Sequence, residues 1–151
     1  MAQQYYNPFA NINLIVPIEQ HDFYNQYCQT GRRASVDQSP FPRMVDFWFA
    51  GLSLAARKQL KPVDLANYET VIIIEGAIFD RDSWRVPVVM LIAIAVEDNV
   101  EVVEDPHRMM AIANGLAAAG VPHIVEMLQQ DRNLDPILNL SDSLYEILEE
   151  K

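Results

Sequence analysis

The nine prolines of this chain stand at the borders of its apolar stretches, and this placement limits the fold more than any other feature. Proline fits the first turn of a helix but interrupts the interior, because it lacks a backbone N–H and clashes with the preceding turn. Asp105-Pro106 and Asp135-Pro136 each place a capping residue directly before a proline, which indicates a helix start. With only five glycines and half of the residues hydrophobic, the chain is expected to form helices separated by corners around one core.

The apolar residues between these corners recur at helical spacing. In residues 43–58 one apolar stripe falls at every third or fourth position, which predicts a helix. Gly120 is expected to end one helix, and Val121-Pro122 to begin the next. Further helices are predicted over residues 84–95, 106–120, 121–130 and 136–148, and residues 80–83 offer capping side chains for the first of these.

Two short segments favour strands. Residues 11–18 alternate weakly between apolar and polar positions until Pro17, although the same run could form an extended arm docked on the body. Residues 71–74 are β-branched and predict a short strand, with a helix as the alternative. The expected fold class is mainly α, with an N-terminal extended arm over residues 1–30. Residues 31–151 would form a single helical domain with one or two short strands.

The chain carries no sign of export or membrane insertion. Its N-terminus lacks a basic segment followed by an apolar one, so it does not resemble a secretory signal. The longest apolar run, residues 86–96, is shorter than the roughly 20 residues that span a bilayer, and it is interpreted as a buried helix or strand. Cys28 is the only cysteine, which excludes an internal disulfide. These features indicate a cytoplasmic protein without a membrane partner, and a buried thiol is favoured over a catalytic one.

Charge is divided unevenly along the chain. Residues 1–61 carry a net charge of +2 and residues 62–151 a net charge of −12, which gives −10 for the whole chain. Such a chain cannot attract nucleic acid through its average field. Contact with DNA would have to come from a local basic patch, while the acidic half faces water or a basic protein partner.

The basic residues gather around one aromatic-rich segment. Arg32 and Arg33 lie in a predicted loop, where guanidinium groups could bind phosphate oxygens in pairs. Cations at the end of the predicted helix over residues 43–58 also have a simpler explanation, because they favour the helix dipole. The candidate DNA-binding residues are Arg32, Arg33, Arg43, Arg57, Lys58 and Lys61. Asp46 is the carboxylate nearest this patch and the candidate catalytic residue, although it could equally pair with Arg43 three positions earlier.

No metal site is predicted. Residues 97–105 contain five carboxylates, and a magnesium-dependent nuclease needs two or three that converge. The pattern of an acidic residue followed by E-x-K is absent, so a solvated acidic loop is favoured. His21, His107 and His123 have no zinc-binding spacing. The three aromatic residues 47–49 could stack on bases, but at helical spacing they are interpreted as core.

Two stretches together resemble a known family. Residues 40–58 (PFPRMVDFWFAGLSLAARK) and 91–128 resemble segments of small proteins encoded beside bacterial DNA phosphorothioate modification and restriction genes, the Dnd and Ssp systems. The chain departs from their pattern at Leu116, where a glycine is expected, and in its longer N-terminal arm. The landmarks of the resemblance are Asp46, Glu97, Glu104-Asp105 and Ala113-Asn114-Gly115.

The resemblance implies a DNA-binding component of a bacterial DNA phosphorothioation defence system. In the Ssp branch it implies a DNA nickase, with Mg or Mn as the cofactor, whose partners are DNA and other phosphorothioation-system proteins. It supplies no catalytic motif to transfer. The alternatives are a non-enzymatic adaptor or oligomeric acidic protein that docks on a modification or restriction partner, and an acidic mimic of DNA. The small-residue helices and the terminal helix are compatible with a homodimer.

Overall fold

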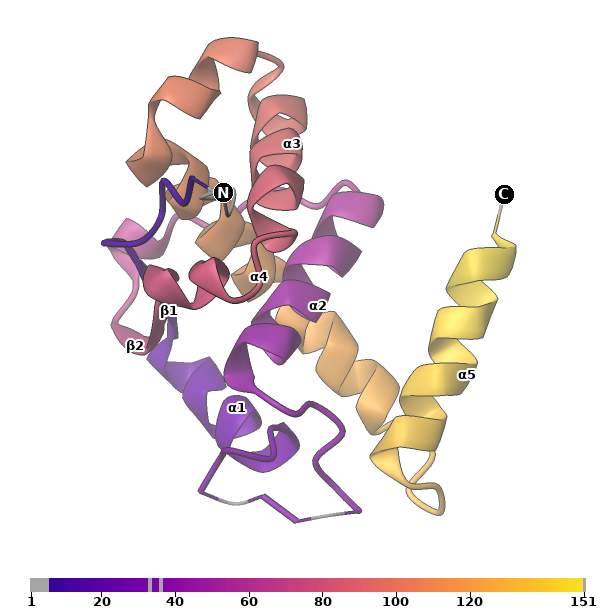
Figure 1. Ribbon diagram of the computed structural model, residues 1–151. Helices are drawn as coiled ribbons and strands as arrows, with labels where there is room; N and C mark the ends of the chain where they lie inside the picture. The colour runs from indigo at the N-terminus through magenta and orange to yellow at the C-terminus, as the bar shows by residue number, and fades with distance from the viewer. Residues whose placement is uncertain (1–5, 33, 36, 151) are drawn as a thin grey trace, which may run out of the picture.

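The computed structural model describes residues 6–32, 34–35 and 37–150. It is mainly helical with one two-stranded antiparallel sheet, as the sequence predicts (Figure 1). The strands and α-helices are β1 Asn13–Pro17, α1 His21–Tyr27, α2 Met44–Arg57, β2 Thr70–Glu75, α3 Arg85–Glu97, α4 Pro106–Leu128 and α5 Pro136–Glu149. The 3-10 helices η1 Ile18–Gln20, η2 Leu65–Asn67, η3 Gly76–Asp80 and η4 Val100–Glu104 connect them.

The long helix α4 is the centre of the fold. It packs against α2, α3, α5 and β1, and most of its residues are buried. It approaches α2 most closely at two glycines: a Cβ on Gly120 would lie 1.8 Å from the carbonyl oxygen of Gly51. The two helix backbones therefore touch, and only glycine leaves room for them.

The predicted break between residues 120 and 122 is wrong, because α4 continues through both. Gly120 serves the contact with α2 and does not end the helix. Pro122 cannot donate a hydrogen bond to the carbonyl of Ala118 one turn earlier. That carbonyl instead accepts a hydrogen bond of 2.9 Å from the side-chain amide of the buried Gln20. A distant side chain thus replaces the hydrogen bond that the proline removes.

Both predicted strands are present and pair with each other. The pairing is irregular between Leu14 and Ile15, where α4 contributes a buried asparagine. The side-chain oxygen of Asn114 accepts hydrogen bonds from the backbone N–H of Ile15, at 3.2 Å, and from the indole of Trp48, at 3.1 Å. Its amide donates to the carbonyl of Asn13 at 3.3 Å. One side chain therefore joins the sheet, α2 and α4.

Residues of the predicted arm also contribute to the core. Phe9, Leu14, Tyr24 and Tyr27 are fully or almost fully buried. The rings of Tyr24 and Tyr27 pack on Phe47 of α2, with centroids 4.7 and 6.2 Å away. The N-terminal segment is thus part of the same hydrophobic core as the helices.

Among the described residues, α4 is the one helix long and apolar enough to cross a membrane by length and composition. Most of its apolar window is buried inside the fold. A central core helix of a globular domain has the same character.

Candidate functional site

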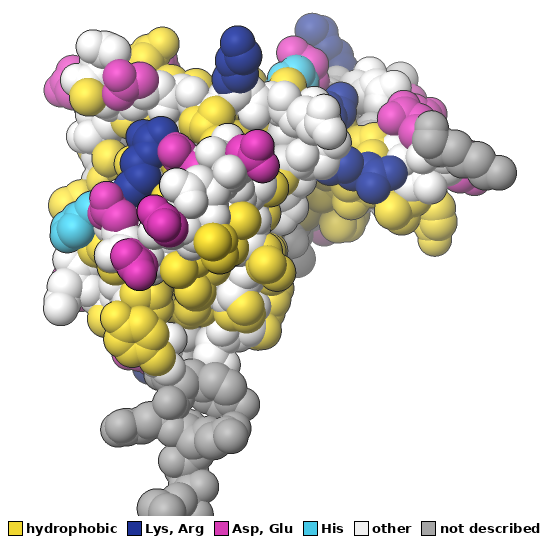
Figure 2. Space-filling model, turned by 90° about the horizontal axis from the view of Figure 1, so that it is seen from above, with side chains coloured by type: hydrophobic (Ala, Val, Ile, Leu, Met, Phe, Trp, Pro, Cys, Tyr) yellow, Lys and Arg dark blue, Asp and Glu magenta, His cyan; other side chains and the backbone are white. Residues whose placement is uncertain are grey.

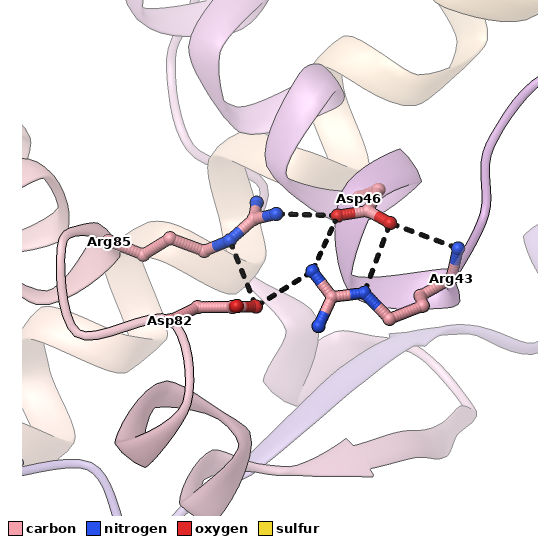
Figure 3. Close-up of polar contacts among 4 residues, drawn as sticks. All are labelled: Arg43, Asp46, Asp82 and Arg85. Atoms are coloured by element: carbon pink, nitrogen blue, oxygen red, sulfur yellow. Dashed lines mark hydrogen bonds and ion pairs between the residues drawn. The ribbon is translucent and has the colours of Figure 1, made fainter.

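The candidate carboxylate Asp46 lies in an ion-pair network that joins the starts of α2 and α3 (Figure 3). Its Oδ2 accepts a hydrogen bond of 3.0 Å from the backbone N–H of Arg43, which caps α2. Its Oδ1 lies 3.1 Å from Nη2 of Arg43 and 2.5 Å from Nη2 of Arg85. Both carboxylate oxygens of Asp46 are therefore engaged.

Asp82 closes the network from the segment before α3. Its Oδ2 lies 2.9 Å from Nη2 of Arg43 and 3.4 Å from Nε of Arg85. These are ion-pair contacts without hydrogen-bond alignment, since neither the Oδ2 nor the Nε has a hydrogen-bond partner. The prediction that residues 80–83 cap α3 with a side chain is wrong: Trp84 occupies the N-cap position without a side-chain cap, and Asp82 binds the arginines.

Arg85 is the most enclosed member of the network, with only 6% of its side chain exposed. Its guanidinium carbon lies 4.5 Å from the ring centroids of both Phe49 and Trp84. Stacking and cation–π attraction hold the group against both rings. Two arginines and two aspartates leave the cluster neutral, so it neither attracts a polyanion nor leaves a charge unpaired.

This network of Arg43, Asp46, Asp82 and Arg85, which we call the clamp, links the starts of α2 and α3. The contacts of its guanidinium with Asp46, which has the larger effect, and with Asp82 raise the pKa of Arg43 above its ordinary value. Arg43 is thus a firmly paired cation. As a catalytic carboxylate, Asp46 would have to react while it is paired with two arginines. As a link between the two helices, it needs no partner beyond these arginines.

The structure divides the candidate DNA-binding residues into two groups. Arg32 is exposed in the loop that leads from α1 to α2, and Arg33 lies outside the described residues. Arg57 and Lys58 lie at the opposite end of α2 from Arg43, about 20 Å away at 1.5 Å per helical residue. The predicted residues therefore do not form one continuous patch.

The basic end of α2 is only partly committed to structure. The Nη2 of Arg57 donates a hydrogen bond of 3.0 Å to the carbonyl of Ile147 in α5. Lys58 and Lys61 are exposed and form no ion pair within the described part of the chain. They remain candidate phosphate contacts.

The acidic segment 97–105 has local structural roles. Glu97 pairs with Arg108 of α4, and Asp105 caps α4 by accepting a hydrogen bond of 3.0 Å from the backbone of Arg108. His107 is exposed beside them. Across the described ranges, no group of three His, Cys, Asp or Glu side chains converges on a common point.

The cysteine and the aromatic residues belong to the core, as predicted. Cys28 is fully buried, and burial, followed by the nearby charge of Asp46, raises the pKa of its thiol to about 12. The thiol is therefore protonated and unreactive at neutral pH. Phe47 and Trp48 are fully buried, while Phe49 packs edge-on against Trp84 at 5.2 Å.

Sequence reasoning missed an open recess of about 860 Å³ beside the sheet. Asp64 and Tyr68 line one part of it, and Glu97 and Arg108 another. The charge of Arg108 is already neutralised by Glu97. The recess thus offers no free charge from that pair to a ligand.

Sequence reasoning also missed the uncovered face of α3. Every residue from Val86 to Val96 is apolar, and the run was expected to be buried. Instead Trp84, Pro87, Leu91 and Ala95 form one exposed stripe, spaced three or four residues apart. The signal was available: a helix with no polar side has more apolar surface than one neighbour covers.

A second uncovered apolar surface lies on α5. This helix lies at the edge of the molecule, where it packs on α4 and accepts one hydrogen bond from Arg57 of α2 (Figure 1). Figure 2 shows hydrophobic side chains on the body and again where the molecule projects to the right. The exposed large apolar residues of α5 are Ile137, Leu138, Leu144, Tyr145 and Leu148.

Comparison with protein-family models, with curated proteins and with solved structures finds no match for this chain. Its function is therefore argued from its own residues.

Proposed function

We propose that this protein is a non-enzymatic acidic adaptor, which works by associating with other protein chains. The observation that supports this most is the exposed stripe of α3, on which Leu91 is 65% exposed in a helix with no polar residue between Arg85 and Glu97. The resemblance to phosphorothioate-system proteins suggests the setting, in which the adaptor docks on a modification or restriction partner.

The exposed apolar side of α3 is unfavourable in water. Val89 and Ala93 on one side of α3 are buried, while Leu91 and Trp84 face solvent. Covering apolar surface yields about 25 cal/mol per Å². The centres of protein interfaces are apolar, poor in charge and rich in aromatic residues. The stripe is apolar and uncharged and begins with the aromatic Trp84, so a second chain would stabilise it.

The clamp gives this stripe a fixed geometry. Arg85 is stacked on Trp84 and paired with Asp46 and Asp82. Trp84 is also packed on Phe49. An anchor side chain held in place before binding loses little entropy on association. In this proposal the clamp contributes to association by holding Trp84 in place.

The stripe suits a second copy of the chain. Between Arg85 and Glu97 the helix has no charged residue, so two copies can meet without bringing like charges together. We therefore expect an oligomeric adaptor with α3 at a two-fold interface.

Sedimentation equilibrium tests this assembly. The wild-type protein should sediment as a dimer, and Leu91→Glu as a folded monomer. Leu148→Glu is the matched control, because it places the same charge at an exposed leucine of α5, and it should remain dimeric. A monomeric wild type, or a dimer unchanged by Leu91→Glu, would contradict self-association through α3.

Incubation with supercoiled plasmid separates the adaptor from the enzyme. With magnesium or manganese, the adaptor should leave the plasmid supercoiled. Metal-dependent conversion to the open circle, abolished by chelator and by Asp46→Asn, would overturn the adaptor and establish a nickase.

A second candidate function, DNA contact, is favoured by the exposed lysines at the end of α2. Lys58 and Lys61 could neutralise phosphates and make binding sensitive to salt. Fluorescence anisotropy with a short duplex should then show weak binding that Lys58→Glu/Lys61→Glu abolishes. Equal binding by this variant and the wild type would exclude these lysines as the contact.

A further inference from the structure

We propose that α5 is the docking site for a cationic amphipathic helix of a partner protein. This inference rests on the adaptor function and names the chemistry of its partner. It uses a surface separate from the α3 stripe.

The apolar side of α5 is only half covered by the fold. Leu140 and Ile147 are 7% and 9% exposed. Leu144 and Leu148 lie next to these two residues around the helix, and their side chains are 40% and 72% exposed. With Ile137, seven residues before Leu144, they form a continuous apolar edge along the helix.

Polar contacts fix α5 in its orientation. The side-chain amide of Asn139 donates hydrogen bonds of 2.9 Å to the carbonyls of Leu128 and Asp131. Near the other end, Arg57 of α2 donates to the carbonyl of Ile147. The helix is therefore held at both ends on its buried side, and its apolar edge stays turned outward.

Exposed apolar side chains continue from this edge around the helix through Tyr145 and Leu138, and the charge next to these two residues selects the occupant. Asp142, Glu146 and Glu149 are all exposed and recur at spacings of four and three residues, so they line one side of the helix, beyond Leu138. The described part of α5 contains no lysine or arginine. A second copy would bring two acidic rows together, which is unfavourable, whereas a basic helix would pair with the row.

The dimensions define the partner segment. α5 has 14 residues and is about 21 Å long. A matching helix carries leucine-like residues at three- and four-residue intervals and lysines or arginines beside them. Apolar contact supplies affinity, and the flanking ion pairs fix orientation, as at the e and g positions of a coiled coil.

Isothermal titration with a synthetic leucine–lysine amphipathic peptide tests the proposal on the full chain. A peptide of identical composition in scrambled order controls for non-specific attraction between opposite charges. The amphipathic peptide should bind more tightly by about tenfold or more, because only it buries the apolar edge. Equal binding of the two peptides would overturn the proposal.

Variants locate the site. Leu144→Gln/Leu148→Gln should weaken binding about tenfold, and Glu146→Gln/Glu149→Gln should reduce its salt dependence. Leu91→Glu should bind the peptide as the wild type does, so failure of the α3 dimer and failure of this site are distinguishable. Unchanged binding by the Leu144/Leu148 variant would refute the site. Loss of dimerisation in that variant would show that a second copy occupies α5, which also refutes it.

Discussion

Two helices, α2 and α5, pack against α4, and they do so in opposite ways. At the α2 crossing the backbones touch at Gly51 and Gly120, and no large apolar side chain of α2 is exposed. α5 contains no glycine, and several of its large apolar side chains face solvent. An amphipathic pattern alone therefore does not determine how completely two packed helices cover each other's apolar surfaces. Small residues at the crossing let two helices share nearly all of their apolar surface.

The most damaging change should be Gly120→Ala, which places a methyl group where α2 and α4 touch. The new methyl group would overlap the Gly51 carbonyl, so the helices must separate. We expect the free energy of unfolding to fall by about 3 kcal/mol or more, despite the higher helix propensity of alanine. Urea denaturation measures this change. Ala119→Ser, which adds one atom at the next, half-buried position, should cost far less; equal losses would show that the crossing is not unusually tight.

Removing the clamp should have the next largest effect. Arg85→Met keeps an unbranched stem but leaves Asp46 and Asp82 with Arg43 alone. We expect a loss of about 2–3 kcal/mol, less than for an isolated buried pair because Arg43 remains. The exposed Arg81 is the matched control, and Arg81→Met should change the thermal midpoint little. If Arg85→Met is as stable as this control, the ion-pair network does not stabilise the packing of α3 on α2.

The buried side of the fold should be sensitive to alkali. Burial holds the pKa of Cys28 near 12 and that of Tyr24 well above 10.0. The unfolded chain loses these protons at lower pH, so their contribution to stability is complete below about pH 9 and declines as the pH rises toward 12. The free energy of unfolding, measured at neutral pH and at about pH 10, should therefore fall.

Tyr24→Phe should reduce this decline. Its hydroxyl has no hydrogen-bond partner, so its removal should change stability at neutral pH by only about 1 kcal/mol or less. Tyr145→Phe, on the exposed side of α5, should leave the decline unchanged. The same slope in both variants would contradict the assignment.

The smallest effect on stability should come from the exposed edge of α5. Leu144→Gln/Leu148→Gln should cost within about 0.5 kcal/mol per site, because the edge has little to lose in the free protein. Leu140→Gln, on the buried side of the same helix, should cost several times more. A large loss from the double variant would show that the edge is already covered.

The sequence predicted the features that depend on neighbouring residues. Asp105 caps α4 before Pro106, both strands form, and Trp48 is core. It could not predict that α4 continues past Gly120 and Pro122. The reasons are the backbone of Gly51 and the amide of Gln20, both far away in the chain.

The candidate site was predicted less well for the same reason. Asp46 was correctly placed beside Arg43, three residues away, but its contact with Arg85 spans 39 positions. The exposed stripes of α3 and α5 depend on which faces α4 leaves uncovered. Periodicity shows that a face is apolar, but not what covers it.

The hydrogen bonds from Ile15 to Asn114 and from Gln20 to Ala118 join positions 99 and 98 residues apart. During synthesis the first strand leaves the ribosome long before these partners exist. The N-terminal segment must therefore wait, exposed, until most of α4 has been made, and folding should be slow for a helical protein. α5 is made after α4, and it adds Leu140 and Ile147 to the core and its acidic row to the surface.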